Sequence, residues 1–397
     1  MPNERDTHLQ TRTRAVHDGR GRRRARLRLA ALGCCLQLTN GCLLAEDLRS
    51  AWHPSHGGPD DPAHAGSGGA SNGGAGSGGA GSGGLGNGGL GGSGLGGSGT
   101  REPTTLAEGA FRLLAIAPPQ LYVVDESVSR LSTDGGPLEP IVDEVGAELQ
   151  RLVADEAYLY GAIFQTPTRT QLWRLPLAGG GFNPAEGGVL LGEARSIAAL
   201  DVNATFVVSL EARPTPSTVQ RDLTRFDEQA GGSERVATLP LLFSSAFALD
   251  ERAAYVVQGV ETEAAIVSVP VAGGEPTPLT GAEPDETFLD LAVSGDQLVF
   301  GSSTRVGQVS AFGGESLLLS PTRAYRVLLD AEFAYFFAAA SGCPDGSELY
   351  RVPLAGGLPV PLASEPAPGC IVQVVADADA LYWLTPSGDQ LRKLDKR

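Results

Sequence analysis

The residue types on which common enzyme sites depend are scarce along most of this chain. All five histidines precede residue 65 of the 397: His8, His17, His53, His56 and His64. Residues 65–397 can therefore hold no Ser-His-Asp triad, no His-ligated zinc and no haem with an axial histidine. The two lysines, Lys393 and Lys396, lie at the carboxyl end, so Schiff-base chemistry has no buried candidate there.

Sequence signatures of phosphate and calcium sites are missing as well. No strand is followed by a Gly-rich loop that ends in Lys, and the nearest piece to an Asp-rich calcium loop is the short run Asp345–Glu348. We therefore expect no cofactor and no metal ion. The same scarcity favours binding over catalysis.

One polar position recurs in the repeat that residues 101–397 form. It lies four residues before the Asp that closes the expected innermost strand, or at the aligned position, and Leu113, Ile197 and Ala246 occupy it in the other copies. Innermost strands line the central channel of a propeller, so the polar members form the candidate ligand site: Arg151, Asp290, Arg326 and Gln373. A solvated channel wall without a ligand is the other interpretation.

The repeat itself is marked by glycine-rich turns. They recur after 44, 52, 42, 40 and 43 residues, at Gly135, Gly179, Gly231, Gly273, Gly313 and Gly356. This period is typical of propeller blades with four strands each. Paired glycines supply the positive φ of a tight type I′ hairpin turn, so each pair predicts a hairpin.

Counting the expected strands predicts how the ring closes. Seven apolar segments read as innermost strands: residues 111–116, 149–154, 196–200, 245–249, 288–293, 325–329 and 371–376. The second and third strands also occur seven times, but only six outermost strands follow them before Arg397. Pro103–Glu108 supplies the seventh, and its pairing with the last third strand would remove the open edge of the sheet. The sequence predicts an all-β, seven-bladed β-propeller with three-plus-one closure over residues 101–397.

Aspartates recur where the innermost strands end. They are Asp155, Asp201, Asp250, Asp330 and Asp377. Their repetition indicates a structural role rather than a metal site, because Asp caps a turn by accepting a hydrogen bond from the backbone two residues further on.

Two late segments carry a family resemblance. Leu381-Tyr382-Trp383-Leu384, followed by Leu391–Asp395, resembles the YWTD-type propeller repeat, and Ala334–Phe337 begins a copy with the same order of features. The pattern is also similar to that of TolB-type propellers of bacterial envelopes. The resemblance implies a propeller fold and a binding role in the envelope, and it assigns no functional residue.

The amino terminus predicts export and lipidation. Residues 1–42 hold nine Arg against three acidic residues, and a short apolar run, Leu29–Leu38, follows the last Arg. This order is typical of an export signal, since the run is too short to span a membrane. Gly41-Cys42 resembles the lipoprotein cleavage box, with Gly33-Cys34 as the alternative. A plain secretory signal with unprocessed cysteines remains the other interpretation.

Residues 43–100 are predicted to be a disordered tether. Twenty of the 35 residues from 65 to 99 are Gly, and such a chain buries too little apolar surface to fold. A flexible coil of this length spans roughly 42 Å. We therefore expect an exported protein that is lipid-anchored to the bacterial cell envelope.

Charge limits the partners of the remaining chain. Residues 43–397 carry a net charge of −22, and an acidic surface repels phosphate backbones, which excludes nucleic acid. Acidic loops such as Asp143-Glu144 and Glu283–Glu286 favour cationic or hydroxylated partners. Solubility alone would also explain the acidity.

Two cysteines remain in the folded part, Cys343 and Cys370. They fall in expected loops of neighbouring blades on one face, so a disulfide is predicted for an exported protein. Two free buried thiols are the alternative.

Three hypotheses follow for function. The first is a monomeric, non-catalytic, envelope-tethered propeller that recognises a protein, peptide or glycan on its loop-bearing face. The second is an extracytoplasmic hydrolase or lyase that uses carboxylates at the channel. The third is a surface scaffold without a defined small ligand.

Overall fold

The computed structural model describes residues 100–397 except 144, 146–147, 167–168, 215–218, 228–231, 241–245, 260–262, 339–345, 367–368 and 372. The predicted signal, with Cys34 and Cys42, and the predicted tether up to residue 99 lie outside the described residues. Contacts within the chain group Leu90–Arg397 as one compact unit, and all the described residues belong to it.

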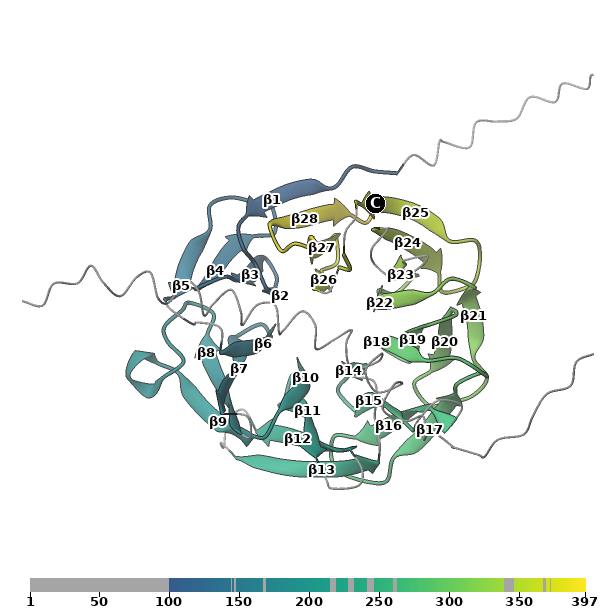
Figure 1. The fold of residues 1–397 in the computed structure, drawn as a ribbon, viewed down its shortest axis with the longest axis horizontal. Helices are drawn as coiled ribbons and strands as arrows, with labels where there is room; N and C mark the ends of the chain where they lie inside the picture. The colour runs from purple at the N-terminus through teal and green to yellow at the C-terminus, as the bar shows by residue number, and fades with distance from the viewer. Residues whose placement is uncertain are drawn as a thin grey trace, which may run out of the picture. The chain divides into compact units, whose positions relative to one another are not determined.

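Seven antiparallel sheets of four strands each surround a common axis (Figure 1). We number the blades by their innermost strands: β2 (Leu113–Ala117), β6 (Leu149–Ala154), β10 (Ile197–Val202), β14 (Phe247–Leu249), β18 (Phe288–Ser294), β22 (Ala324–Leu329) and β26 (Val374–Ala376). The second strands are β3 (Gln120–Val124), β7 (Tyr158–Thr166), β11 (Phe206–Pro214), β15 (Ala253–Gln258), β19 (Gln297–Ser302), β23 (Phe333–Ala338) and β27 (Ala380–Leu384).

The outer half of each blade consists of a third and a fourth strand. The third strands are β4 (Val128–Ser132), β8 (Arg169–Pro176), β12 (Val219–Asp227), β16 (Ala265–Pro270), β20 (Val306–Ser310), β24 (Ser347–Pro353) and β28 (Gln390–Asp395). The outermost are β5 (Glu139–Val142), β9 (Val189–Ala194), β13 (Ser233–Pro240), β17 (Thr277–Gly281), β21 (Leu317–Ser320), β25 (Val360–Glu365) and β1 (Thr104–Glu108). The predicted seven-bladed β-propeller is confirmed.

The hydrophobic core lies between the blades. Seven clusters of buried side chains each join two neighbouring blades, and neighbouring innermost strands are in contact all the way round the ring. Second strands are apolar on both faces, as in β27 with five buried residues in succession. Between blades six and seven, the rings of Phe337 and Trp383 meet edge to face with centroids 5.8 Å apart. Each blade is therefore stabilised by both of its neighbours.

Blade seven joins the two ends of the propeller. Strand β1 pairs antiparallel with β28, with Thr105 opposite Arg392 and Ala107 opposite Leu391. The Arg392 guanidinium also donates to the Thr105 hydroxyl at 2.8 Å. The predicted three-plus-one closure is confirmed. Strand β1 supplies the fourth strand of the last sheet, so the edge of β28 is paired.

Both lysines secure the end of the chain. The Lys396 ammonium donates to the Asp377 carbonyl at 2.8 Å and forms an ion pair with Asp330 at 3.3 Å, which ties the terminus to blade six. The Lys393 ammonium donates to the Thr133 carbonyl of blade one at 3.0 Å. These contacts lock the last strand on both sides.

The glycine-rich turns differ from the predicted type I′ geometry. In the five pairs whose first glycine is described, that glycine closes a four-residue turn, as where the Gly135 N–H donates to the Ser132 carbonyl at 2.9 Å. Gly135 and Gly136 have φ of +88° and +134°, but the central residues Thr133 and Asp134 do not have positive φ. The prediction was wrong because the glycines follow the turn, where the chain needs a left-handed residue to enter the fourth strand.

No helix among the described residues is long and apolar enough to cross a membrane.

Candidate binding site on the propeller

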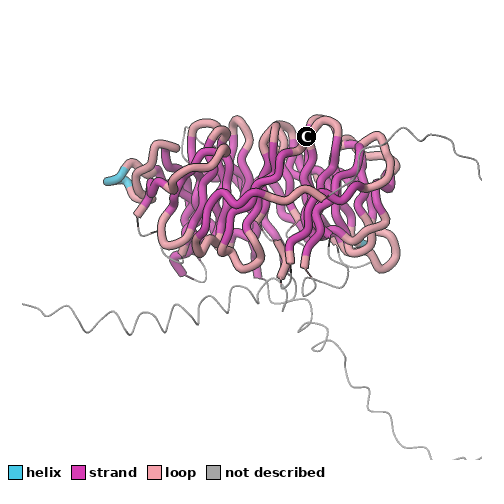
Figure 2. Tube along the Cα trace, turned by 90° about the horizontal axis from the view of Figure 1, so that it is seen from above, coloured by secondary structure: helices cyan, strands magenta, loops and turns pink. Residues whose placement is uncertain are grey.

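The strand order gives the ring two different faces, which Figure 2 shows from the side. We call one the loop face; it carries the connections from second to third strands, such as 125–127 and 303–305, and those between blades, such as 282–287. The opposite turn face carries the turns that follow the innermost strands and the glycine-rich turns.

Four aspartates on the turn face are turn caps, as predicted. In each, Oδ1 accepts hydrogen bonds from the backbone N–H groups two and three residues further on, at 2.7–3.0 Å. Oδ2 accepts from a tyrosine hydroxyl five residues further on. The four are Asp155, Asp250, Asp330 and Asp377. This repeated Asp–Tyr pair fixes the first turn of its blade and leaves both carboxylate oxygens occupied.

The electrostatics of these pairs agree with a structural role. Burial raises the pKa of Asp330, but the N–H groups of Glu332 and Phe333 and the Tyr335 hydroxyl outweigh it, so the net shift is downward. Burial, and then the hydrogen bond to Asp330, raise the pKa of Tyr335. The aspartate is thus ionised and the tyrosine neutral at pH 7.

Asp201 does not cap a turn, which corrects the prediction. In blade three Asn203 has that role, and its Oδ1 accepts from the N–H groups of Thr205 and Phe206 at 2.9 and 2.8 Å. Asp201 lies two residues earlier, inside β10, and burial raises its pKa to about 6. Asn and Asp cap such turns equally well. The channel position lies four residues before the cap, which in blade three is Ala199. Counting from Asp201 instead of Asn203 had assigned that position to Ile197.

Three of the four predicted channel residues lie at one level around the axis. Arg151, Asp290 and Arg326 are each the third residue of their innermost strands, β6, β18 and β22, near the loop face. The side chain of Arg326 is 34% exposed and that of Asp290 is 17% exposed. Solvent therefore reaches these groups, although they belong to the innermost strands.

Asp290 and Arg326 form an ion pair between blades five and six. Arg326 Nη1 lies 3.7 Å from Asp290 Oδ1, and the Val327 N–H donates to Asp290 Oδ2 at 2.9 Å. Burial raises the pKa of Asp290, and the positive charge of Arg326 partly opposes this shift. Asp290 thus joins two blades as well as facing the axis.

Arg151 reaches from blade two to blade three. Its Nη2 and Nε donate to the Ala198 carbonyl at 3.0 and 3.3 Å, and its Nη1 donates to the Gln150 carbonyl at 2.8 Å. Burial and the nearby charge of Arg326 lower the pKa of Arg151. Arg112, which sequence analysis missed, similarly donates to the Leu149 carbonyl of blade two.

Gln373 is not brought into this group by any hydrogen bond. It directly precedes β26, and its backbone carbonyl accepts from the Leu384 N–H at 3.1 Å. Its side-chain amide has no hydrogen-bond partner among the residues described. The structure therefore gathers Arg151, Asp290 and Arg326 and leaves Gln373 beside them.

An acidic hollow opens on the loop face at blade one. It has a volume of about 640 Å³ and is lined by Ala110, Asp125, Glu126, Ser127 and Asp143. Asp125 Oδ1 accepts from the backbone N–H and the hydroxyl of Ser127 at 2.7 and 3.0 Å. Glu126 and Asp143 are exposed, and neither forms an ion pair with a basic side chain within the described part of the chain. Glu144, the other half of the predicted acidic loop, lies outside the described residues.

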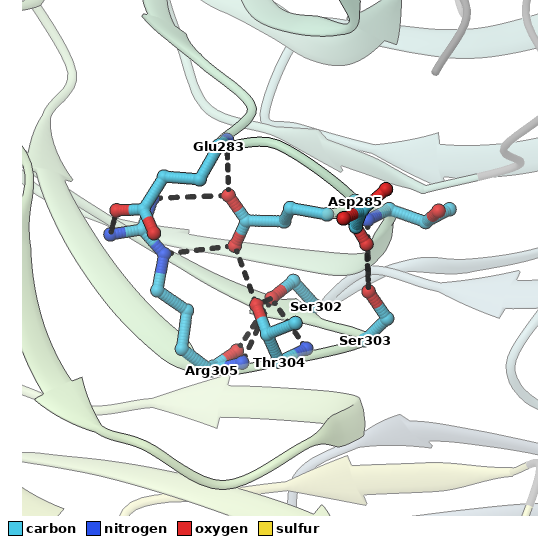
Figure 3. A network of polar contacts seen from close by, with 8 residues as sticks. Glu283, Asp285, Ser302, Ser303, Thr304 and Arg305 are labelled. Carbon is cyan, nitrogen blue, oxygen red and sulfur yellow. Dashed lines mark hydrogen bonds and ion pairs between the residues drawn. The ribbon is translucent and has the colours of Figure 1, made fainter. Parts of the chain in front are cut away.

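The second predicted acidic loop, in blade five, is partly neutralised by an arginine beside it. Figure 3 shows Arg305 beside Glu283, which forms an ion pair with its Nη1 at 2.7 Å. Glu286, which is fully buried, accepts from Arg305 Nε at 2.8 Å and from Nη2 at 3.1 Å. Asp285 contributes its backbone carbonyl, to which the Ser303 hydroxyl donates. This loop is held by an internal ion network and presents less negative charge than its sequence indicates.

The predicted cysteine pair lies partly outside the described residues. Cys370 is disulfide-bonded, whereas Cys343 falls in the undescribed segment 339–345. Their pairing with each other stays a prediction. No group of three or more His, Cys, Asp or Glu side chains that could hold a metal ion occurs among the described residues.

Comparison with known proteins supports the fold. No family model and no curated sequence matches the chain. Among solved structures, a puromycin hydrolase has a TM-score of 0.52 at 13% identity, covering 73% of this chain and 52% of that one. A chain of a mitotic checkpoint complex has a TM-score of 0.51 at 11% identity, with 75% and 94% covered.

A third similar structure is the β-propeller domain of the Trilobed protease from Pyrococcus furiosus, described as having an open velcro topology. Its TM-score is 0.50 at 9% identity, with 73% of this chain and 97% of that domain covered. This chain spans about half the length of the puromycin hydrolase. At such identities the likeness shows the β-propeller fold alone.

The hollow combines residues that sequence analysis did not connect. Asp143 was identified as part of an acidic loop, but Asp125 and Glu126 were not. A signal was present, because Asp125-Glu126 falls in a second-to-third-strand connection, which emerges on the same face as the connection between blades. Combining loop class with charge would have brought these residues together.

Proposed function

We propose that the chain is a non-catalytic binding propeller, tethered to the bacterial envelope, whose loop face takes a cationic segment of a protein or peptide. The tether and a lipid on Cys42 would hold the ring near the membrane. The hollow of blade one would be the main contact.

The carboxylates of the hollow are the single observation that carries this proposal. Glu126 and Asp143 are exposed and have no basic partner among the described residues, while Ser127 occupies one oxygen of Asp125. In blade five, by contrast, Arg305 pairs with two of the three carboxylates of the acidic loop, those of Glu283 and Glu286. Unpaired carboxylates around a concave surface attract a Lys or Arg side chain and exclude anionic partners.

The charge of the whole propeller has the same sign. Residues 101–397 hold 39 Asp and Glu against 20 Lys and Arg, a net charge of −19. Long-range attraction would speed the encounter with a basic partner and weaken as salt is added. The specific contact must come from the hollow, because net charge alone does not select one face.

Calorimetry with hexalysine as the probe tests the proposal. We expect saturable binding at low ionic strength to the purified chain. The double variant Glu126→Gln/Asp143→Asn should weaken it at least tenfold. The matched control Glu156→Gln/Glu332→Gln removes two exposed charges from the turn face and should change the affinity less than twofold. Equal losses in both variants would show non-specific attraction, and binding of a neutral oligosaccharide but not of hexalysine would contradict the cationic partner.

The anchor has its own test. In cells that export the protein, Cys42→Ser should move it from the membrane fraction to the soluble fraction, and Cys34→Ser should not. If the Cys42→Ser variant stays in the membrane fraction and the Cys34→Ser variant moves to the soluble fraction, the lipidated residue is Cys34. Retention of both would contradict a lipid anchor.

A further inference from the structure

We propose that the loop-face end of the ring axis binds a carboxylate anion between Arg151 and Arg326. This site is separate from the acidic hollow of blade one and is opposite to it in charge, so it does not depend on the proposed function.

The first argument is position. Arg151 belongs to β6 in blade two and Arg326 to β22 in blade six, and each is the third residue of its strand. Blades two and six lie on opposite sides of the axis (Figure 1). The charge of Arg326 nevertheless acts on Arg151, since it lowers the pKa of the Arg151 guanidinium. Two cations thus lie at the same level of the innermost strands, on blades at opposite sides of the axis.

The second argument is the missing counter-ion of Arg151. Its guanidinium donates only to the carbonyls of Ala198 and Gln150, and it has no carboxylate partner within the described part of the chain. A largely buried charge is normally paired, because taking it out of water is costly. Backbone carbonyls orient this guanidinium but do not neutralise it.

The third argument is the local charge balance, which selects the class of anion. Two guanidinium groups and one carboxylate, Asp290, share this level. Asp201, the other aspartate of an innermost strand in this part of the ring, accepts from the N–H groups of Val202 and Leu249 and is not paired with either arginine. One positive charge is left over, which suits a singly charged carboxylate better than a phosphate dianion. The planar fork of an arginine also matches a carboxylate in geometry.

Access and polarity fit a small ligand. Arg326 is 34% exposed, so solvent reaches it. The side-chain amide of Gln373, at the corresponding position of blade seven, has no partner among the described residues and can donate a further hydrogen bond. The carboxylate could belong to a small organic acid or to the carboxyl terminus of a peptide.

Titration calorimetry with the purified chain at low ionic strength tests this site. The probes are acetate, triglycine with a free carboxyl terminus, and triglycine amide. We expect saturable binding of acetate, of free triglycine or of both, and none of the amide. Binding of acetate alone would identify a small acid as the source, whereas much tighter binding of free triglycine would identify a peptide terminus.

Variants separate binding from structural support. Arg151→Gln and Arg326→Gln should each weaken the affinity at least tenfold, whereas Asp290→Asn should strengthen it several-fold by removing the competing carboxylate. Arg112→Gln is the matched control, since it removes a similar guanidinium-to-carbonyl bond between blades one and two, and it should leave the affinity within twofold. The site would be refuted by the absence of saturable binding, by an equal loss in Arg112→Gln, or by weaker binding in Asp290→Asn.

Discussion

Replacing Arg305 by Met would leave the carboxylate of Glu286 without its cation. The Glu286 side chain is 0% exposed and that of Arg305 is 10% exposed, and two hydrogen bonds of 2.8 and 3.1 Å join them. Removing one member of such a buried pair costs about 3–5 kcal/mol of folding free energy, because the remaining charge stays buried and unpaired. The methionine still fills much of the space that the arginine stem occupied.

This cost translates into a change in melting temperature. An unfolding entropy of about 2.1 cal/mol/K per residue gives about 0.6 kcal/mol/K for a propeller of this size, so Tm should fall by about 5–8 °C. Thermal unfolding followed by circular dichroism at pH 7 measures this shift. The double variant Glu286→Gln/Arg305→Met has no unpaired charge and should recover at least half of the loss.

The pH dependence gives a second readout of the same pair. Burial raises the pKa of Glu286, but Arg305 and the Glu283 N–H outweigh it, and the net shift is downward. A lowered pKa contributes stability that is present above the unfolded pKa and lost as the pH falls through the folded one. The difference in Tm between the wild type and Arg305→Met should therefore become smaller below about pH 4. A Tm within 1 °C of wild type at pH 7, or a double variant no better than the single one, would refute this reasoning.

Three further predictions concern the stability of the ring. Lys396→Met removes the contacts to Asp377 and Asp330 and should lower the free energy of unfolding by about 1–3 kcal/mol in denaturant titrations; no change would show that the terminus is not locked. Burial raises the pKa of Asp201 to about 6. Its ionised form therefore destabilises the fold above about pH 6, and this destabilisation becomes smaller as the pH falls toward about 4. Asp201→Asn should therefore stabilise the protein by up to about 3 kcal/mol at pH 7.5, and an equal gain at pH 4 would contradict the assignment. Peptide mapping without reductant should recover a Cys343–Cys370 bridge worth about 3.5 kcal/mol, and a bridge to any other cysteine would disprove the pairing.

The fold could be predicted because its signals are repeated. Each blade carries an apolar innermost strand and a turn, and six of the seven carry a glycine-rich turn, so an error in one copy does not change the count. The closure followed from a missing fourth strand, and Thr105 does lie opposite Arg392. Features that differ in one blade were predicted less well. In blade three, for example, Asn203 caps the turn that an aspartate caps in other blades.

The site could be predicted only in part, because it depends on contacts between blades. The polar column was visible in the sequence, and the structure brings three of its members to one level. The hydrogen bond from Arg151 to Ala198 joins two blades, and that from Arg305 to Glu286 joins two loops. No local sequence pattern specifies how these segments are placed against each other. Sequence also overstated the acidity of Glu283–Glu286, since it did not show that Arg305 lies among these carboxylates.

Hydrogen–deuterium exchange with and without hexalysine tests the assignment of the binding face most directly. We predict slower exchange in peptides that cover the lining residues of the blade-one hollow, Ala110, Asp125–Ser127 and Asp143, with no change at the turn-face residues 155–157 and 330–333. Protection confined to the turn face, or spread evenly over both faces, would contradict the account.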